Sequence, residues 1–360
     1  MKILFAMAHP YLPEFSGGIQ SSTHEMAQGL MNRGHKVAIL ANLIGEGLGG
    51  YRTRIARKLL RRQAIADNRV GYPVYRTWFA WDAAEELVDL AKPDVVVVQP
   101  RLPVRLAKAF EPTNVPVVLY IRDVEFKDHG GDMRDLSTSK FIANSKFTAD
   151  HYFQAFGIES TVIPPLVKAE HYRVVSRRKN VTFINPHPEK GVELAIQIAE
   201  QCPDIPFSFV ESWTLNDDYK AELRRRLEKV PNVSLLPRTD DMRTIYRDAR
   251  IMLVPSKWKE AWGRVVSEAH FSGIPALAAS TGGLPESVGP GGVVMRQDAP
   301  LTEWVAALRK LWSDEPYYNS LSSAALTYAG RMELNADYQM ATLIGVLRGA
   351  ISEKRAGGRC

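Results

Sequence analysis

Apolar and polar residues are arranged along this chain in blocks that predict a repeating order of strands and helices. Short, nearly continuous apolar runs, such as those at 2–6 and 94–99, are typical of strands buried on both faces of a parallel sheet. Longer stretches with apolar residues at every third or fourth position, as at 19–33, predict amphipathic helices between them. The alternation runs through most of the chain and favours an α/β fold class.

The same reading gives two series of elements. In the first series strands are expected at 2–6, 37–40, 70–77, 94–99, 115–121 and 140–144, with helices at 19–33, 83–91 and from Ser145 to Phe156. In the second series strands are expected at 181–184, 207–210, 233–236, 251–254 and 276–279, with helices at 192–201, 219–229, 242–249, 264–271, 301–311, 316–331 and 337–347. The basic, polar segment 176–180 suits a linker and places the boundary near 165–178. We therefore expect two Rossmann-like doubly wound domains, at 1–168 and 169–335, followed by 336–360.

Length and composition agree with this reading. A chain of 360 residues is too long for one ordinary core, and 45% apolar with 24% charged residues is typical of a soluble globular protein. No run approaches the roughly 20 apolar residues of a membrane span. The apolar N-terminus is followed at once by Pro10, which favours a buried strand over a signal peptide. The two cysteines, Cys202 and Cys360, form no disulfide framework, and a reducing cytoplasm is expected.

The segment 255–292 has the clearest pattern of candidate ligand-binding residues. It begins at the proline that ends the strand expected at 251–254. A loop with Glu260 and Gly263 leads into the helix that starts near Arg264, so residues 261–263 form a helix N-terminus, which favours an anion. Gly263 lets the backbone approach a phosphate closely. Glu260 and Glu268 stand at either end of this segment. Carboxylates on both sides of a phosphate site suit a ligand with hydroxyls on both sides of its phosphates, such as a nucleotide sugar.

These residues resemble a known family. Glu260, seven residues and Glu268 are similar to the E-x7-E motif of retaining GT-B glycosyltransferases, family 4 in particular, and the flanking P-S, E-x-W-G, S-E-A, S-G-I-P and G-G-L-P-E agree. The resemblance implies a GT-B fold, with two Rossmann-like domains facing across a cleft and a C-terminal helix in 336–360 that returns to the first domain. It also implies transfer of a sugar from a nucleotide-diphosphate sugar to a hydroxyl acceptor, with retention at the anomeric carbon.

In the first domain the resemblance covers Gly17-Gly18 and the helix that ends in R-G-H-x-V. It implies that this glycine loop faces the donor phosphates and the acceptor. Arg122 stands where the family often has a histidine, so that histidine's role is not carried over. Arg122 is a candidate contact for donor phosphate or an acidic acceptor, and Asp123 for a sugar hydroxyl, or the two residues brace the loop. His129, in an expected mobile loop with Gly130 and Gly131, is expected to be incidental.

In the second domain Lys190-Gly191 matches the family's K-G, and Lys190 is the implied phosphate-binding lysine. The arginine of the family's G-R-L is replaced by Asn185-Pro186, so Arg264, Arg122 or the backbone must take its place. His187 is expected to be incidental. The catalytic candidates are Glu260, Lys190, Arg122 and Asp123. The expected donor-binding residues are Gly17, Gly18, Lys190, Arg238, Thr239, Glu260, Ala261, Trp262, Gly263, Arg264, Val265 and Glu268.

The implied mechanism stabilises the charge that grows on the leaving diphosphate. Lys190 and the amides of 261–263, with Arg264 as a further candidate, would stabilise it. Glu268 would bind the ribose hydroxyls, Glu260 the hydroxyls of the donor sugar, and backbone near Arg238 the base. A front-face reaction, in which the leaving phosphate takes the acceptor proton, needs no protein base. Since no D-x-D triplet occurs, we expect no metal, and no cofactor besides a UDP- or GDP-linked sugar as co-substrate.

The basic segment Tyr51–Arg62 leaves three interpretations open: an amphipathic helix on an anionic membrane surface, a site for an acidic or phosphate-bearing acceptor, or a solvated helix. We expect a glycolipid or glycan acceptor in cell-surface polysaccharide assembly, a cytoplasmic location that includes the inner membrane face, and no nucleic-acid partner. The tail 354–360 is expected to be disordered. A phosphorylase, a nucleotide-sugar epimerase and a non-catalytic binding subunit of the same fold are the alternatives.

Overall fold

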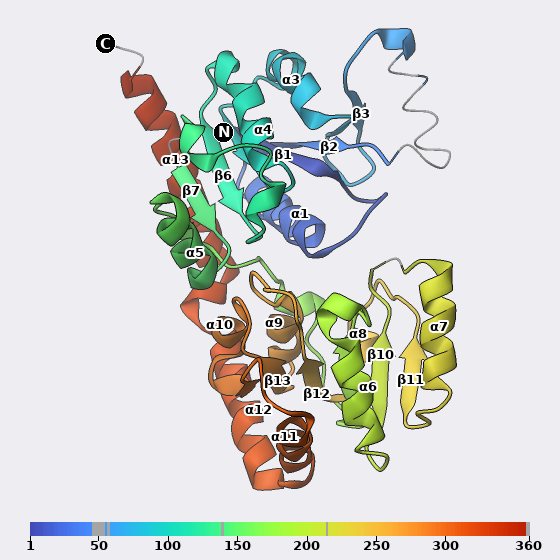
Figure 1. Cartoon of the computed structure of the whole chain (residues 1–360). Helices are drawn as coiled ribbons and strands as arrows, with labels where there is room; N and C mark the ends of the chain where they lie inside the picture. Colours follow the sequence, from blue (N-terminus) through green and yellow to red (C-terminus); the bar gives the residue numbers. More distant parts are fainter. Residues whose placement is uncertain (45–54, 56–57, 138–139, 214, 358–360) are drawn as a thin grey trace. The chain divides into compact units, whose positions relative to one another are not determined.

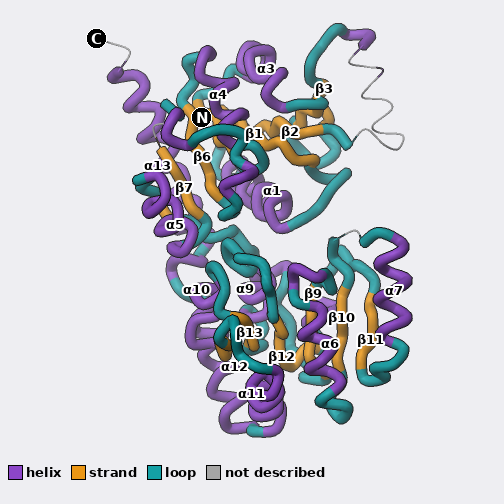
Figure 2. The backbone as a smooth tube through the Cα atoms, viewed as in Figure 1, coloured by secondary structure: helices purple, strands orange, loops and turns teal. Residues whose placement is uncertain are grey.

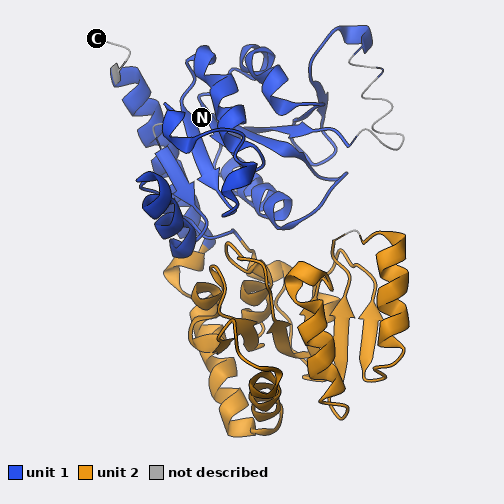
Figure 3. Ribbon diagram, viewed as in Figure 1, with its two compact units in different colours: residues 1–166, 336–360 blue, residues 167–335 orange. Residues whose placement is uncertain are grey.

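The structure, a computed structural model, describes residues 1–44, 55, 58–137, 140–213 and 215–357. The chain divides into two compact units (Figure 3). Unit 1 comprises residues 1–166 and 336–360, and unit 2 comprises residues 167–335. In each unit strands lie at the centre with helices around them (Figure 2).

Unit 1 is built on an eight-stranded sheet within the described residues, with the order β3-β4-β2-β1-β5-β6-β7-β8 (Figure 1). Its strands are β1 (Lys2–Pro10), β2 (Lys36–Asn42), β3 (Ile65–Asp67), β4 (Val74–Thr77), β5 (Val95–Val98), β6 (Val117–Ile121), β7 (Lys140–Ala143) and β8 (Thr161–Val162). Its helices are α1 (Gly18–Met31), α3 (Ala84–Ala91), α4 (Pro103–Phe110), α5 (Lys146–Phe156) and α13 (Ala336–Gly357). Among the described strands of this unit, only β3 pairs antiparallel, with β4.

The strands of unit 1 bury both faces because their apolar runs are continuous. In β1, Ile3 and Phe5 pack with α1 and α13, while Leu4 and Ala6 on the opposite face pack with α3 and α4. The four valines of β5 divide between the two faces in the same way. The near-continuous valine run therefore reflects a sheet covered by helices on both sides.

The described residues of unit 2 form a six-stranded sheet with the order β11-β10-β9-β12-β13-β14, parallel throughout. Its strands are β9 (Asn180–Ile184), β10 (Phe207–Val210), β11 (Val233–Leu236), β12 (Ala249–Val254), β13 (Ala276–Ala279) and β14 (Gly292–Met295). Its helices are α6 (Val192–Glu200), α7 (Asp217–Leu227), α8 (Arg243–Tyr246), α9 (Arg264–His270), α10 (Leu284–Val288), α11 (Leu301–Ser313) and α12 (Glu315–Ala329).

The core of unit 2 also has two faces. Ile251 and Leu253 of β12 pack in the cluster that includes α6, α7 and α11, while Met252 and Val254 pack in the cluster that includes α9 and α10. The expected α/β class and the doubly wound sheets are thus present in both units.

Several expected elements differ from the structure for local reasons. The strand expected from residue 70 begins only at Val74, because Gly71 has a φ of +89° in the preceding turn. The helix expected at 242–249 ends at Tyr246, and Ala249 already pairs with Asn180 in the sheet. The glycine loop expected at 280–285 ends before Leu284, where α10 begins, and residues 354–357 continue α13 rather than being disordered.

Besides α10, the strands β3, β8 and β14 and the helix α4 were not expected. Helix α4 is only eight residues long and has a proline in its first turn, so its apolar residues repeat over too few turns to predict a helix. Strand β14 follows a stretch rich in glycine and proline that is typical of a loop. Across the described parts of the chain, no helix combines the length and the apolar character needed to cross a bilayer.

Candidate functional site

The sheet of unit 2 has the strand order in which an α/β domain forms a ligand crevice. The chain moves outward from β9 through β10 to β11, then returns to the other side of β9 and continues through β12. The loops after β9 and β12 therefore diverge at the carboxyl edge of the sheet, at the switch point where such folds bind ligands. These loops are residues 185–191 and 255–263, which contain Lys190 and Glu260.

Close backbone packing joins the two loops. Gly191 has a φ of +82°, and a Cβ at this position would lie 1.9 Å from the carbonyl oxygen of Pro255. The amides of Lys257 and Trp258 donate to the carbonyl oxygen of Glu189 at 2.9 and 3.0 Å. Only glycine fits at position 191, and its presence after Lys190 fixes the distance between the loops.

Lys190 and Glu260 meet at this junction although 70 residues separate them. The Lys190 Nζ donates to Glu260 Oε1 at 2.6 Å, and Ser256 Oγ donates to the same oxygen at 2.9 Å. The two charged side chains are 17% and 15% exposed, so each remains partly open to solvent. Ser256 belongs to the P-S pair that ends β12, but the sequence did not indicate its bond to Glu260.

The backbone of Glu260 is supported by the glycine loop that follows β13. Gly282 has a φ of +59°, and a Cβ there would lie 2.0 Å from the Glu260 carbonyl oxygen. The amide of Gly283 donates to that oxygen at 2.6 Å. The G-G of the G-G-L-P-E segment therefore positions Glu260.

Helix α9 begins where the sequence predicted it, at Arg264, with Gly263 as its N-cap at a φ of +90°. The Trp262 side chain is 3% exposed, and its Nε1 donates to Ser267 Oγ at 3.0 Å. Val265 packs partly into the adjacent core, whereas Ala261 is only half-buried. In the segment 261–263, Trp262 therefore offers its backbone, not its indole, to a ligand.

Glu268 lies on α9 and is 6% exposed. Tyr246 donates its hydroxyl to Oε2 at 2.6 Å, and Arg264 donates Nε to Oε1 at 2.8 Å. Burial, followed by the charge of Glu268, raises the pKa of Tyr246 well above its usual value, so this hydroxyl stays a donor. Arg264 also donates Nη2 to the Tyr172 hydroxyl at 2.7 Å. The sequence did not reveal Tyr246 and Tyr172, which lie far from Glu268 along the chain.

Arg238 and Thr239 follow β11, two strands away from β9. Arg238 lies 3.8 Å from the carboxylate of Asp240, and Thr239 Oγ1 accepts from the amide of Asp241 at 3.1 Å. These contacts build a turn at the edge of the sheet. They do not include the Lys190–Glu260 pair.

Unit 1 has its own switch point, between β1 and β5. Gly17 is the N-cap of α1 and Gly18 is its first residue, so the expected glycine loop lies at this edge. The loop before it is tied to α1 by Gln20, whose Nε2 donates to the carbonyl oxygen of Pro10 at 3.0 Å.

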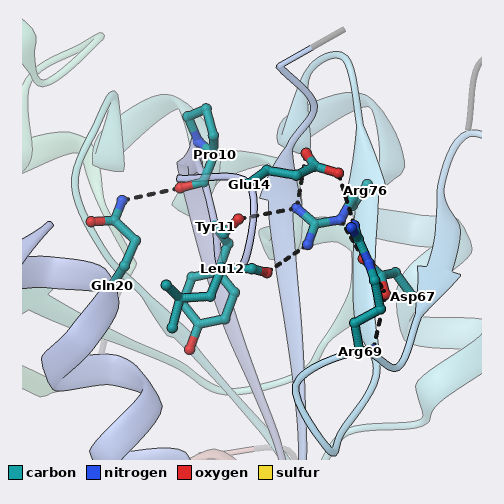
Figure 4. A network of polar contacts seen from close by, with 8 residues as sticks. All are labelled: Pro10, Tyr11, Leu12, Glu14, Gln20, Asp67, Arg69 and Arg76. Atoms are coloured by element: carbon teal, nitrogen blue, oxygen red, sulfur yellow. Dashed lines mark hydrogen bonds and ion pairs between the residues drawn. The ribbon is translucent and has the colours of Figure 1, made fainter. Parts of the chain in front are cut away.

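The loop between β1 and α1 is also held by Arg76, which the sequence did not single out (Figure 4). Arg76 is 1% exposed and donates to the carbonyl oxygens of Tyr11 and Leu12, at 3.3 and 2.6 Å. The same guanidinium donates to the carboxylates of Glu14 and Asp67, at 3.2 and 2.9 Å. A buried cation on β4 therefore sets the path of the chain that leads to Gly17.

Arg122 and Asp123 follow β6 and point to different surroundings. Arg122 is 8% exposed, and its Nη1 donates to Ile19 O and Thr23 Oγ1, both at 3.1 Å. Its charge is therefore directed at the first turns of α1. Asp123 is half-buried and accepts from the Tyr152 hydroxyl at 3.4 Å. Burial, with the charge of Glu125 as a second cause, raises the pKa of Asp123 to about 7.

His129, expected in a mobile loop and as incidental rather than catalytic, is part of a buried cluster. His129 is 2% exposed, and its Nε2 lies 2.6 Å from the hydroxyl of Tyr152, the residue that also contacts Asp123. Burial lowers the pKa of His129 to about 4, so the ring is neutral at physiological pH. The single histidine of this loop thus supports the side chain beside Asp123.

Potential metal ligands do not gather in the described parts of the chain. No group of three or more His, Cys, Asp or Glu side chains there could hold a metal ion. Cys202 is buried in the core of unit 2.

Comparisons with known proteins agree for both units. The family model described as "Glycosyl transferases group 1" matches residues 181–327, and the model described as "Glycosyltransferase Family 4" matches residues 16–171. Among solved structures, HepE of Anabaena is similar to this chain with a TM-score of 0.75 and 19% identity, over 97% of this chain and 100% of HepE.

Curated relatives match over shorter regions. D-inositol 3-phosphate glycosyltransferase of Corynebacterium diphtheriae is 35% identical over 116 residues, which are 31% of this chain and 27% of that protein. The protein of the same name from Segniliparus rotundus is 33% identical over 249 residues, which are 61% of this chain and 55% of that protein. The chain therefore spans about half the length, or less, of these relatives.

Proposed function

Because this chain belongs to the group 1, family 4 glycosyltransferases and has their GT-B fold, we propose that it transfers a sugar from a nucleotide-diphosphate sugar to a hydroxyl acceptor with retention of anomeric configuration. The observation that carries this proposal is the Lys190–Glu260 pair at the switch point of unit 2. A cation for phosphate and a carboxylate for sugar hydroxyls stand side by side there, at the start of α9.

Lys190 is proposed to stabilise the leaving diphosphate. As the bond between the anomeric carbon and the phosphate oxygen breaks, negative charge grows on that oxygen, and a fixed ammonium lowers the energy of this state. The backbone amides at 261–263 add donors at the start of α9. Glu260 binds hydroxyls of the donor sugar and, through its 2.6 Å bond, holds the ammonium in position.

The acceptor proton goes to the departing phosphate in this proposal. The acceptor oxygen attacks the anomeric carbon from the face that the phosphate leaves, and the phosphate oxygen takes the acceptor's proton. The new bond therefore has the configuration of the old one. No side chain has to act as a base in this step.

Glu268 is proposed to bind the ribose hydroxyls of the donor. Its two oxygens already accept from Tyr246 and Arg264, and a carboxylate has about four acceptor positions. The two existing bonds orient the carboxylate and leave acceptor capacity for a diol. Arg264 acts through Glu268 in this proposal, because its guanidinium is shared between Glu268 and Tyr172.

Unit 1 is proposed to supply the acceptor side of the reaction. Gly17 and Gly18 form a loop without side chains at the switch point of this unit, where phosphates and acceptor can approach the backbone. Asp123 is proposed to contact a sugar hydroxyl, and Arg122 to hold the first turns of α1 in place.

A uridine or guanosine diphosphate sugar is the proposed donor. Structures of HepE, the Anabaena protein, contain UDP and UDP-glucose, which supports uridine as the first nucleoside to test. Relatives named for transfer to an inositol phosphate support an acceptor that carries hydroxyls, and a glycolipid or glycan is proposed here.

The proposed location is cytoplasmic, with contact to the inner membrane face. The segment Tyr51–Arg62 is the proposed contact, and half of it lies outside the described residues. Of its described part, Leu59 and Leu60 are exposed, at 77% and 62%. Exposed leucines among arginines suit an anionic lipid surface.

The test is a product assay. The purified chain is incubated with UDP- and GDP-linked sugars and a panel of glycan and glycolipid acceptors, and the released nucleoside diphosphate is measured. The anomeric configuration of the product is then read from its NMR coupling constants. A product with the donor's configuration supports the proposal, and an inverted product refutes the retaining mechanism.

Two other results would support the alternatives. Release of a sugar 1-phosphate from a glycan and inorganic phosphate would indicate a phosphorylase. Tight binding of a nucleotide sugar, with no transfer to any acceptor in the panel, would favour a non-catalytic binding subunit.

A further inference from the structure

An aromatic side chain stands beside the Lys190–Glu260 pair and has no part in the function proposed above. Trp213 lies in the loop after β10, the strand next to β9. Its side chain is 39% exposed, whereas Trp262 and Trp304, also in unit 2, are buried. An indole that remains open at the carboxyl edge of a sheet is available to a ligand.

The loop that carries Trp213 is fixed by Asn185, part of the Asn185-Pro186 pair that replaces the arginine of the G-R-L motif. Asn185 is 5% exposed and has a φ of +68°, a conformation that asparagine tolerates better than most residues. Its Oδ1 accepts from the backbone amide of Trp213 at 3.2 Å. Asn185 therefore turns the chain after β9 and ties it to the loop after β10.

Two neighbours hold the indole next to the phosphate-binding lysine. The Lys190 Nζ lies 4.9 Å from the centre of the Trp213 ring, within the range of a cation–π interaction. The His187 ring meets the indole at a centroid distance of 5.3 Å and an angle of 62°. His187, which we expected from the sequence to be incidental, thus contributes to the orientation of Trp213.

The order of strands indicates which part of the donor meets Trp213. Across the sheet edge, Glu260 follows β12, Lys190 follows β9, Trp213 follows β10 and Arg238 follows β11. A nucleotide sugar is a linear molecule of sugar, diphosphate and nucleoside. The proposed function has the sugar at Glu260, the diphosphate at Lys190 and the ribose at Glu268. Because Glu268 is bonded to Tyr246 of α8, the helix that follows the turn after β11, the base extends from the ribose toward the loops after β11 and β10.

We propose that Trp213 is a donor-binding residue whose indole packs against the base of the nucleotide, in addition to its contact with Lys190. This inference rests on the proposed function and extends it to a residue of the loop after β10. Stacking uses the π-face that every base has, so Trp213 adds affinity without selecting one base. Selection of the base is then left to hydrogen bonds from the turn at Arg238 and Thr239.

The test compares ligands that have a base with one that lacks it. Titration calorimetry measures the affinity of the full chain for UDP, GDP and inorganic pyrophosphate, in the wild type and in Trp213→Leu and Trp213→Phe. Leucine keeps apolar area without a π-face, and phenylalanine keeps a smaller π-face. Trp78→Leu, which changes a tryptophan of similar exposure in unit 1, is the matched control.

We expect Trp213→Leu to weaken binding of UDP and GDP at least about fivefold. Pyrophosphate affinity should change less than about twofold, and Trp213→Phe should keep most of the affinity for UDP. Thermal melting of each variant without ligand checks that it is folded.

Three results would overturn the inference. Unchanged UDP affinity in Trp213→Leu would show that the indole does not touch the nucleoside. An equal loss for UDP and pyrophosphate would show that Trp213 acts only through Lys190. If the wild type bound no nucleoside diphosphate, the proposed function would fall as well, which distinguishes this failure from the other two.

Discussion

The loop that leads to Gly17 depends on one buried cation, and replacing Arg76 by methionine tests this dependence. Methionine fills similar space but removes four hydrogen bonds, two to carbonyl oxygens and two to carboxylates. The side chains of Glu14 and Asp67 are only 13% and 16% exposed, so each loses a donor in a poorly hydrated place. Both keep their ion pair with Arg69, whose side chain is 50% exposed, while the carbonyl oxygens of Tyr11 and Leu12 lose the bond from Arg76. Removing one member of a buried ion pair costs about 3–5 kcal/mol of unfolding free energy.

This cost is large enough to measure. For a unit of this size each kcal/mol lowers the melting temperature by about 2–4 °C, so a decrease of about 6–20 °C is expected. Differential scanning calorimetry of the full chain measures it. Arg134→Met is the control, because Arg134 forms its ion pair with Asp132 at the surface, where such pairs contribute little. Arg76→Lys keeps the charge but not the fork of donors, and should melt between the wild type and Arg76→Met.

The variant also tests whether Arg76 positions the glycine loop for the reaction. We expect the kcat of Arg76→Met, measured below its melting temperature, to decrease about tenfold to a hundredfold, since small displacements of binding groups have effects of this size. The affinity for UDP should fall less than kcat, because the proposed contacts of Lys190, Glu268 and the turn at Arg238 are in unit 2 and the glycine loop of unit 1 contacts the phosphates alone. A lower melting temperature with unchanged kcat would limit Arg76 to stability. An unchanged melting temperature would refute the energetic reasoning.

Three further changes test other parts of the structure. Lys190→Met should lower kcat about 10²–10³-fold, because the charge on the leaving diphosphate loses its fixed cation; equal activity of Lys190→Met and of the surface variant Lys310→Met would contradict this. Tyr246→Phe removes a donor from the buried Glu268 carboxylate and should lower the unfolding free energy by about 1.5–3 kcal/mol, seen as a lower urea midpoint; an unchanged midpoint would argue against the bond. Asp123→Asn should melt above the wild type, and the difference should widen from about pH 4 to pH 7 and then level off. Burial raises the pKa of Asp123 from 3.8 to about 7, so the stability that its proton supplies is complete below pH 3.8 and lost as the pH rises through 7; a constant difference across this range would contradict the pKa.

The apolar pattern predicted most of the fold because burial on two faces leaves a clear signal. Strands β10, β11 and β13 were predicted with the bounds that the structure has, and the family resemblance is confirmed for both units. The pattern was less informative where an element is short or where its ends depend on tertiary contacts. The start of β4 is set by the turn at Gly71, whose φ is positive, and the end of α8 by the pairing of Ala249 in the sheet.

The candidate site was predictable where a local motif carries it and not where distant residues meet. Glu260, Glu268 and Lys190 lie in segments with a recognisable pattern, and the ion pair of Arg264 with Glu268 follows from their spacing along α9. The bond of Tyr246 to Glu268, the position of Trp213 beside Lys190 and the burial of His129 all depend on how the chain folds back on itself. No spacing along the sequence reports such contacts.

The close pairing of Lys190 with Glu260 bears on competition from other anions in the cell. A phosphate ion that approaches the Lys190 ammonium meets a carboxylate 2.6 Å from it, and the pair has no net charge to attract the ion. A ligand that binds the Lys190 ammonium weakens or replaces the hydrogen bond from Lys190 to Glu260. Such a ligand therefore has to donate a hydrogen bond to the Glu260 carboxylate in return. The hydroxyls of a sugar next to a diphosphate do so, whereas inorganic phosphate brings only further negative charge. With Lys190 as the proposed phosphate contact, we therefore expect free phosphate to compete poorly with a nucleotide sugar for this place.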